Sequence, residues 1–204
     1  PAGLANLQKT LDKITERDAD LVSSAHSIYE YVRDNFTCDD DGIYLTSDLY
    51  DINKAKKGSV ADLNMLLIGL LRLKGIPADP VILSTRENGK NSADYPLLYK
   101  MNYLICMTTI LGNYTYLDAS KPELGFGQLP LDCYNGHARV IREDGGTALY
   151  LNPSSIQEQE VTAVFINNEG NGKLGGSCES LYGNFGTELL RNEINTAEDK
   201  KIFF

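Results

Sequence analysis

Four cysteines and two histidines are the residues of this chain that could support nucleophilic catalysis. A cysteine thiolate attacks carbonyl carbon atoms, and a neighbouring histidine can accept the thiol proton. The cysteines show no CxxC spacing, which excludes zinc-ribbon and thioredoxin-type sites. Four cysteines in 204 residues are also far too few for a disulfide scaffold. We therefore expect free and mostly buried thiols at Cys38, Cys106, Cys133 and Cys178.

Cys133 and His137 lie four residues apart and could form a thiol–imidazole pair. His26 falls beside the apolar stripe of an expected helix, where a surface or partly buried structural histidine is the usual outcome. A working thiol enzyme would need Cys38 or Cys133 within hydrogen-bond reach of one of the two histidines. A structural role for both histidines is the favoured interpretation, and a thiol enzyme is kept as the alternative.

The segment Asp39-Asp40-Asp41-Gly42 is the strongest candidate for a metal site. Calcium loops of the EF-hand type alternate their oxygen ligands and end in a bidentate glutamate, and this segment has neither feature. We expect a solvated polar loop from Cys38 to Gly42. No metal and no other cofactor is expected.

One buried helix is the element best suited to position a nucleophile. Ser59, with Asp62 three residues later, predicts a capped start. Nearly every residue from Leu63 to Leu73 is apolar, which predicts a helix buried on most sides, and Gly75 predicts its end. A cysteine in the first turn of such a helix would have its thiolate stabilised by free N–H groups and the helix dipole.

The elements around this helix predict an α+β fold with an antiparallel sheet. Amphipathic stripes predict a helix near residues 4–14, a second that follows Asp18 as its N-cap and ends near Asn35, and a short one near 47–54. A short apolar segment at 43–45 precedes the last of these. The expected strands are Val81–Leu83, Asn102–Ile110, Tyr114–Asp118, Ala138–Ile141 and Ala148–Leu151.

A boundary is expected at Pro153-Ser154-Ser155, which divides the chain into a first domain, 1–153, and a second segment, 154–204. The second segment contains a hairpin, 161–166 with 173–181, and a helix from about Thr187 to Lys200. Two strands and a helix are too little for a stable domain of their own. We expect them to begin a larger, truncated β-rich domain.

Composition limits the partners. The net charge of −9 and the pI near 4.7 argue against nucleic acid, which needs clustered lysine and arginine. No apolar run approaches the roughly 20 residues of a membrane-spanning helix. The hydrophobic and charged fractions are those of an ordinary globular protein.

Three segments resemble the motifs of transglutaminase-like domains. Lys57-Gly58-Ser59-Val60-Ala61-Asp62, the apolar run and Gly75-Ile76-Pro77-Ala78 resemble the helix that carries the nucleophilic cysteine. Asn102-Tyr103-Leu104-Ile105 and Tyr116-Leu117-Asp118-Ala119-Ser120 resemble the strands that carry the histidine and the aspartate. The resemblance implies a papain-like core with helices packed on an antiparallel sheet. It is greatest to bacterial cell-envelope proteins with flanking β domains, which implies a periplasmic or outer-membrane-associated location.

The departures from these motifs predict lost catalysis. Val60 stands at the position of the family's cysteine and Tyr103 at that of its histidine, so only Asp118 is retained. An isopropyl group cannot form an acyl-enzyme, and a phenol with an ordinary pKa near 10 is a poor base. Ser59 beside Val60 is expected to cap the helix. In the family the region of Cys133 is a loop, without a helix N-terminus to activate a thiol.

The resemblance therefore predicts a catalytically inactive module that binds a peptide, a glycan or an envelope protein, or that only spaces other domains. Its expected binding surface is the old substrate cleft, formed by Ser59, Val60, Asn102, Tyr103 and Asp118. The alternative is a cysteine-type amidase, peptidase or transglutaminase that acts through a relocated thiol, Cys38 or Cys133.

Overall fold

The computed structural model describes residues 2–40, 42–95, 97–170 and 172–196. The chain divides into two compact units, Pro1–Ser155 and Ile156–Phe204, and each is described by itself. Whether the second unit begins a larger β-rich domain stays a prediction.

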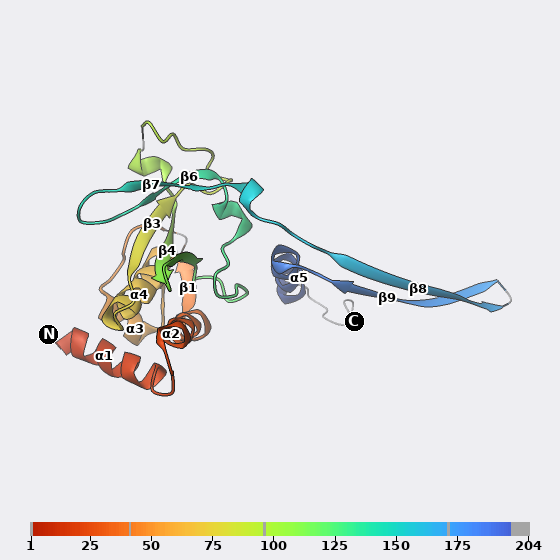
Figure 1. Ribbon diagram of the computed structural model, residues 1–204, viewed down its shortest axis with the longest axis horizontal. Coiled ribbons are helices and arrows are strands. Elements are labelled where there is room, and N and C mark those ends of the chain that lie inside the picture. The colour runs from red at the N-terminus through yellow and green to blue at the C-terminus, as the bar shows by residue number, and fades with distance from the viewer. Residues whose placement is uncertain (1, 41, 96, 171, 197–204) are drawn as a thin grey trace. The chain divides into compact units, whose positions relative to one another are not determined.

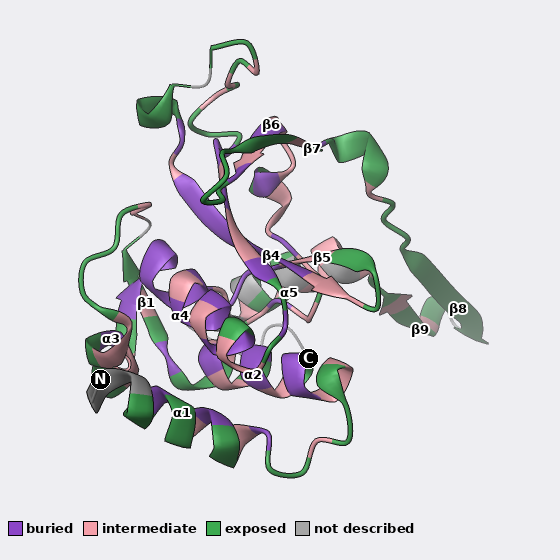
Figure 2. Cartoon of the chain, turned by 60° about the vertical axis from the view of Figure 1, so that its left-hand side comes forward, coloured by how far each residue is buried: buried purple, intermediate pink, exposed green. Residues whose placement is uncertain are grey.

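The helices of the first unit gather around one central helix (Figure 1). They are α1 (Ala2–Ile14), α2 (Leu21–Asn35), α3 (Leu49–Ala55) and α4 (Val60–Leu73). The other three all contact α4, and ten of its residues are buried. This confirms the expected buried helix (Figure 2). The expected N-cap of α2 was wrong by two residues: Asp20 accepts the Ser23 N–H at 2.7 Å, whereas Asp18 accepts the Ser27 hydroxyl.

The start of α4 is fixed by a capping box, as the sequence predicted. Ser59 Oγ accepts the Asp62 N–H at 3.1 Å, and Asp62 Oδ2 accepts the Ser59 N–H at 3.0 Å. The loop before α3 adds two donors to the same carboxylate, because Thr46 donates its N–H at 2.9 Å and its hydroxyl at 2.5 Å. The first turn of α4 is thereby held to the preceding loop.

Asp62→Asn is expected to lower the free energy of unfolding by about 1–2 kcal/mol at pH 7, because an amide cannot accept all of these hydrogen bonds. Burial alone would raise the pKa of Asp62, but the hydrogen bonds from Thr46 and Ser59 outweigh it and hold the pKa below its ordinary value. Such a carboxylate stabilises the fold above its unfolded pKa, and the stabilisation is lost as the pH falls through its folded pKa.

The measurement is urea unfolding of both proteins between pH 7 and pH 3. The difference between their free energies of unfolding should be constant near neutral pH and should shrink below about pH 4. Asp144→Asn, at an exposed position between two strands, is the matched control and should leave the stability unchanged. A difference for Asp62→Asn that does not vary with pH would contradict the role assigned to the charge.

A five-stranded antiparallel sheet lies beside α4, in the order β5-β4-β3-β6-β7. Its strands are β3 (Ala78–Leu83), β4 (Tyr103–Ile110), β5 (Asn113–Leu117), β6 (Gly136–Val140) and β7 (Thr147–Leu151), which confirms the expected strands and hairpins. Alternate residues of β4 serve two hydrophobic clusters. Cys106 packs with leucines of α4, and Tyr103 and Ile105 pack with Leu129 and Cys133 of the segment that follows β5.

The segment after α2 differs from the expectation. The sequence predicted a polar loop from Cys38 to Gly42, but Thr37–Asp40 forms β1, a parallel partner of β2 (Lys57–Ser59). Cys38 pairs with Gly58 in this register, and Asp41 lies outside the described residues. The apolar segment at 43–45 forms no strand. The pairing depends on a contact between segments 20 residues apart, which the local sequence does not reveal.

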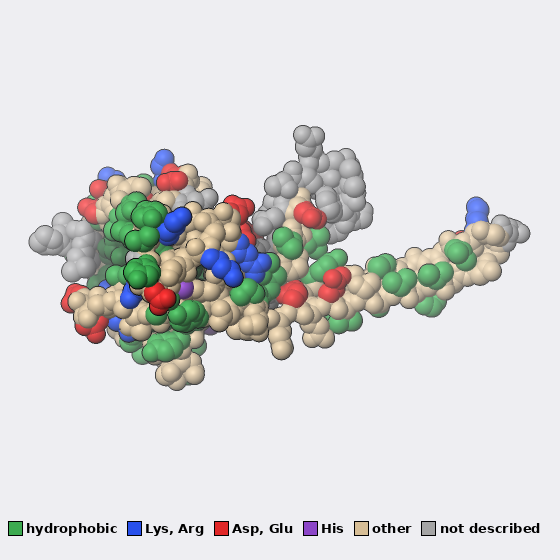
Figure 3. Space-filling view, turned by 90° about the horizontal axis from the view of Figure 1, so that it is seen from above, with side chains coloured by type: hydrophobic (Ala, Val, Ile, Leu, Met, Phe, Trp, Pro, Cys, Tyr) green, Lys and Arg blue, Asp and Glu red, His purple; other side chains and the backbone are tan. Residues whose placement is uncertain are grey.

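The second unit contains β8 (Val161–Gly170), β9 (Lys173–Leu181) and α5 (Asn184–Thr196), so the expected hairpin is present. The helix begins three residues earlier than expected, and its expected end at Lys200 lies outside the described residues. Hydrophobic side chains are exposed along the hairpin (Figure 3), among them Val164, Phe165, Ile166 and Leu174.

Candidate functional site

Asp118, directly after β5, is the centre of a buried polar network. Its side chain is 0% exposed. One carboxylate oxygen, Oδ2, accepts the Tyr103 hydroxyl at 2.8 Å. The other, Oδ1, accepts the Asn64 amide at 2.9 Å and both the N–H and the hydroxyl of Ser120, at 2.9 and 2.6 Å. All four donors are neutral groups, and they occupy both carboxylate oxygens.

Asn64 joins three elements and was missed by the sequence analysis. It lies one turn after Val60 on α4, is fully buried, and also donates from its amide to the Leu104 carbonyl at 2.9 Å. Its oxygen accepts the Ala119 N–H at 2.9 Å. The available signal was an amide within an otherwise apolar helix, since a buried polar side chain must find partners. Ser120, which lay within a recognised motif, was likewise given no role.

Tyr103 holds the position where the resemblance places a base. Its ring is 5% exposed, and its hydroxyl lies 3.3 Å from the Ser120 hydroxyl as well as beside Asp118. Burial raises the pKa of Tyr103 far above the ordinary phenol value, and the neighbouring Asp118 and Cys133 raise it further. The phenol is therefore protonated at neutral pH and acts as a hydrogen-bond donor to Asp118.

Val60 is the first residue of α4, at the position where the resemblance places a nucleophile. It is 0% exposed and belongs to the same hydrophobic cluster as Tyr103 and Cys133. Ser59 is also buried, and its hydroxyl caps the helix as expected. Of the three positions that the resemblance assigns to a triad, Val60 and Tyr103 thus share one hydrophobic cluster, and Tyr103 is hydrogen-bonded to Asp118.

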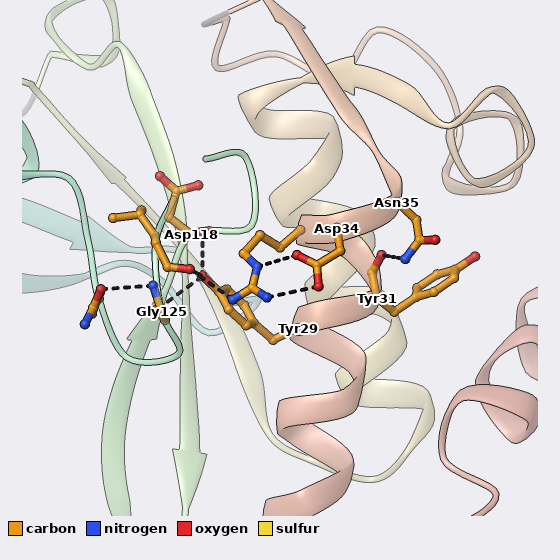
Figure 4. A network of polar contacts seen from close by, with 9 residues as sticks. Tyr29, Tyr31, Asp34, Asn35, Asp118 and Gly125 are labelled. Atoms are coloured by element: carbon orange, nitrogen blue, oxygen red, sulfur yellow. Dashed lines mark hydrogen bonds and ion pairs between the residues drawn. The ribbon is translucent and has the colours of Figure 1, made fainter. Parts of the chain in front are cut away.

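Helix α2 supports the Asp118 region from the outside (Figure 4). The buried Tyr29 hydroxyl lies 3.1–3.3 Å from the carbonyl oxygens of Asp118, Leu124 and Gly125, so its single proton is shared among them. Arg33 donates to the Leu124 carbonyl at 3.1 Å and pairs with Asp34. These contacts hold the backbone after β5, and with it the direction of the Asp118 side chain.

A cavity of about 240 Å³, here called the Tyr103 cavity, opens next to this network. Of the five residues expected to bind a ligand, Asn102 and Tyr103 line it; Ser59, Val60 and Asp118 are buried and do not. Asn102 is itself held in place, because its side chain accepts the Thr85 N–H and donates to the Thr85 hydroxyl, both at 2.9 Å. The recess is therefore lined by the residue at one of the three positions where the resemblance places catalytic residues, and not by the residues at the other two.

The relocated-thiol alternative required a thiol bonded to an imidazole. His26 is exposed and stacks on Phe126, with ring centres 3.7 Å apart. His137 is 7% exposed, and neither of its ring nitrogens has a hydrogen-bond partner. Burial, together with the nearby Arg139, lowers the pKa of His137. Within the described residues, neither histidine is hydrogen-bonded to Cys38 or Cys133.

The four cysteines differ in burial. Cys106 is fully buried, as expected, and burial raises its pKa. Cys133 is 2% exposed and lines the Tyr103 cavity. Cys38 is partly exposed and lines a second cavity of about 380 Å³, here called the Cys38 cavity. Cys178 is exposed, contrary to the expectation of mostly buried thiols.

Residues 2–40, 42–95, 97–170 and 172–196 contain no group of three or more histidine, cysteine, aspartate or glutamate side chains that could hold a metal ion. None of the helices in the described part of the chain is long and apolar enough to cross a membrane.

The family model of the transglutaminase-like superfamily matches residues 8–138, which is well over half of the chain. The chain belongs to this superfamily, as its three motifs predicted. No curated protein matches it.

Two solved structures resemble the chain at low sequence identity. A "putative protease" of Parabacteroides distasonis superposes with a TM-score of 0.53 and 14% identity over 83% of this chain. A "putative cysteine protease" of Cytophaga hutchinsonii has a TM-score of 0.47 and 15% identity over 87% of it. The first likeness supports the papain-like α+β fold. This chain spans only 34% and 51% of the two neighbours' lengths.

Proposed function

We propose that this chain is a transglutaminase-like module without acyl-transfer activity, which serves as a binding or spacer domain of a bacterial envelope protein. The observation that carries the proposal is the hydrogen bond from the Tyr103 hydroxyl to Asp118, at the place where a catalytic base would be needed. The envelope location is supported only by the resemblance of the motifs to envelope proteins.

The chemistry of the three positions supports the loss of catalysis. Acyl transfer by this type of site needs a nucleophile, a base that takes its proton and a group that orients the base. Val60 has no lone pair, and Tyr103 is a donor whose raised pKa prevents it from accepting a proton at neutral pH. The aspartate that would orient the base is engaged by four neutral donors.

A binding role is supported by the Tyr103 cavity. Its volume of about 240 Å³ accommodates one side chain or one small ring, and its wall combines the polar Asn102 with the aromatic Tyr103. Concave sites with an apolar wall and a few fixed polar groups are the usual places where ligands bind. A pure spacer needs no such recess.

The alternative of a relocated thiol has one observation in its favour, which is that Cys133 lines the Tyr103 cavity. A thiol in that place would still need a base to form the thiolate at neutral pH. The unbonded His137 nitrogens do not supply one.

The test is incubation of the chain with a glutamine-containing peptide, with and without a primary amine, followed by mass spectrometry. We expect neither hydrolysis nor amine incorporation above the rate in buffer alone. The matched control is the Cys38→Ser, Cys133→Ser variant. A product that forms with the natural chain and disappears with this variant would overturn the proposal in favour of a relocated thiol.

A further inference from the structure

The Tyr103 cavity and the Cys38 cavity share one lining residue. Lys121 lines both cavities, and Ser120 next to it lines the second while lying 3.3 Å from the Tyr103 hydroxyl of the first. Both cavities therefore border Lys121, with volumes of about 240 and 380 Å³, and the pair is here called the groove, with the Tyr103 cavity as its first half and the Cys38 cavity as its second. Two neighbouring cavities suit an extended ligand that places one group in each.

The charged residues of this groove are mostly acidic. Glu87 and Asp132 line the first half and Asp39 and Asp40 the second, and Lys121 is the one basic residue among the described residues that line it. Lys57, outside the groove, lies 3.8 Å from Asp39 in an exposed ion pair, which leaves an acidic excess. The net charge of −9 for the chain acts in the same direction and attracts cations from solution.

The two segments that carry the acidic pair of the first half are joined by a backbone hydrogen bond. The Arg86 N–H donates to the Asp132 carbonyl at 3.1 Å, which ties the segment that carries Glu87 to the segment that carries Asp132. Both acidic residues are exposed, and the same cavity is lined by Pro130 and the buried Tyr103. The lining therefore offers a proline and an aromatic ring together with two exposed carboxylates.

Lysine and arginine side chains match this arrangement, because their aliphatic stems cover apolar surface while the charged head stays at a polar edge. We propose that the groove binds an extended peptide segment with a lysine or arginine side chain, whose stem lies over Pro130 and Tyr103 and whose head lies between Glu87 and Asp132. This inference rests on the proposed binding function and names its ligand class.

The test uses the complete chain and three fluorescein-labelled peptides, Ala-Ala-Lys-Ala-Ala and its glutamine and glutamate counterparts, in fluorescence anisotropy titrations. The lysine peptide should bind at least about tenfold more tightly than the glutamine peptide, with a preference that weakens as salt rises. Glu87→Gln with Asp132→Asn should abolish the preference. The matched control, Glu143→Gln with Asp144→Asn, removes the same amount of charge at an exposed turn. It should retain the preference for the lysine peptide.

Two outcomes separate this inference from the proposed function. Equal binding of the three peptides, with slower alkylation of Cys133 in their presence, would overturn the charge preference and leave the binding module intact. The absence of binding by every peptide would overturn the groove as a peptide site. Cleavage of a bound peptide during the titration would overturn the proposed lack of catalysis instead.

Discussion

The double change Val60→Cys, Tyr103→His is expected to create a thiol that reacts with iodoacetamide at pH 7 at least about tenfold faster than the same cysteine introduced alone. The first turn of α4 would supply free N–H groups and the positive end of the helix dipole to the new thiolate. The histidine would stand beside Asp118, whose Oδ2 already accepts a hydrogen bond from the side chain at 103. Replacing the phenol would also open space next to the buried position 60.

The measurement is the alkylation rate of each cysteine, resolved by peptide mass spectrometry. Val60→Cys alone is the matched control, because it provides the nucleophile without the base. The exposed Cys178 serves as an internal reference in every sample. If the double variant is no faster than this control, the assignment of positions 60, 103 and 118 to the ancestral triad is contradicted.

Asp118→Ala is expected to lower the free energy of unfolding by about 3 kcal/mol, the largest stability effect foreseen for this chain. The substitution would leave four buried donors, from Tyr103, Asn64 and Ser120, without their acceptor. Each unsatisfied buried donor carries a desolvation cost, which can be reduced only if water enters the space.

Asp118→Asn separates hydrogen bonding from charge. Its amide oxygen can replace Oδ1 and accept the hydrogen bonds from Asn64 and Ser120. The Tyr103 hydroxyl can turn to accept a hydrogen bond from the amide nitrogen. We therefore expect the free energy of unfolding to fall by about 1 kcal/mol or less. Urea unfolding at pH 7 measures both variants. A loss from Asp118→Asn as large as that from Asp118→Ala would show that the charge, and not the set of hydrogen bonds, stabilises this site.

The sequence predicted those elements that carry their own local signals. The capping box at Ser59 and Asp62, the apolar run behind it and Gly75 defined α4, and alternation with turn residues defined both hairpins of the large sheet. The motif spacing then placed Tyr103 and Asp118 together, and their hydrogen bond agrees with it. A helix or strand whose pattern lies within its own segment can therefore be predicted from the sequence.

The remaining features depend on contacts between distant segments. The parallel pairing of Cys38 with Gly58 joins segments with no apolar alternation, so β1 was taken for a loop. Asn64 looked like an isolated amide in a buried helix until β4 and the segment after β5 supplied its partners. The groove is likewise lined by separate segments, 38–40, 85–87, 102–103, 120–122 and 130–133, and its acidic pair, Glu87 and Asp132, left no signal in either segment alone.

Cysteine-resolved alkylation of the natural chain at pH 7 tests the proposed lack of catalysis most directly. Because no thiol is hydrogen-bonded to a histidine in the described chain, we expect Cys38, Cys106 and Cys133 each to react more slowly than the exposed Cys178. A selective reaction of Cys38 or Cys133 that is faster than that of Cys178, and that is lost in His137→Ala, would contradict the account.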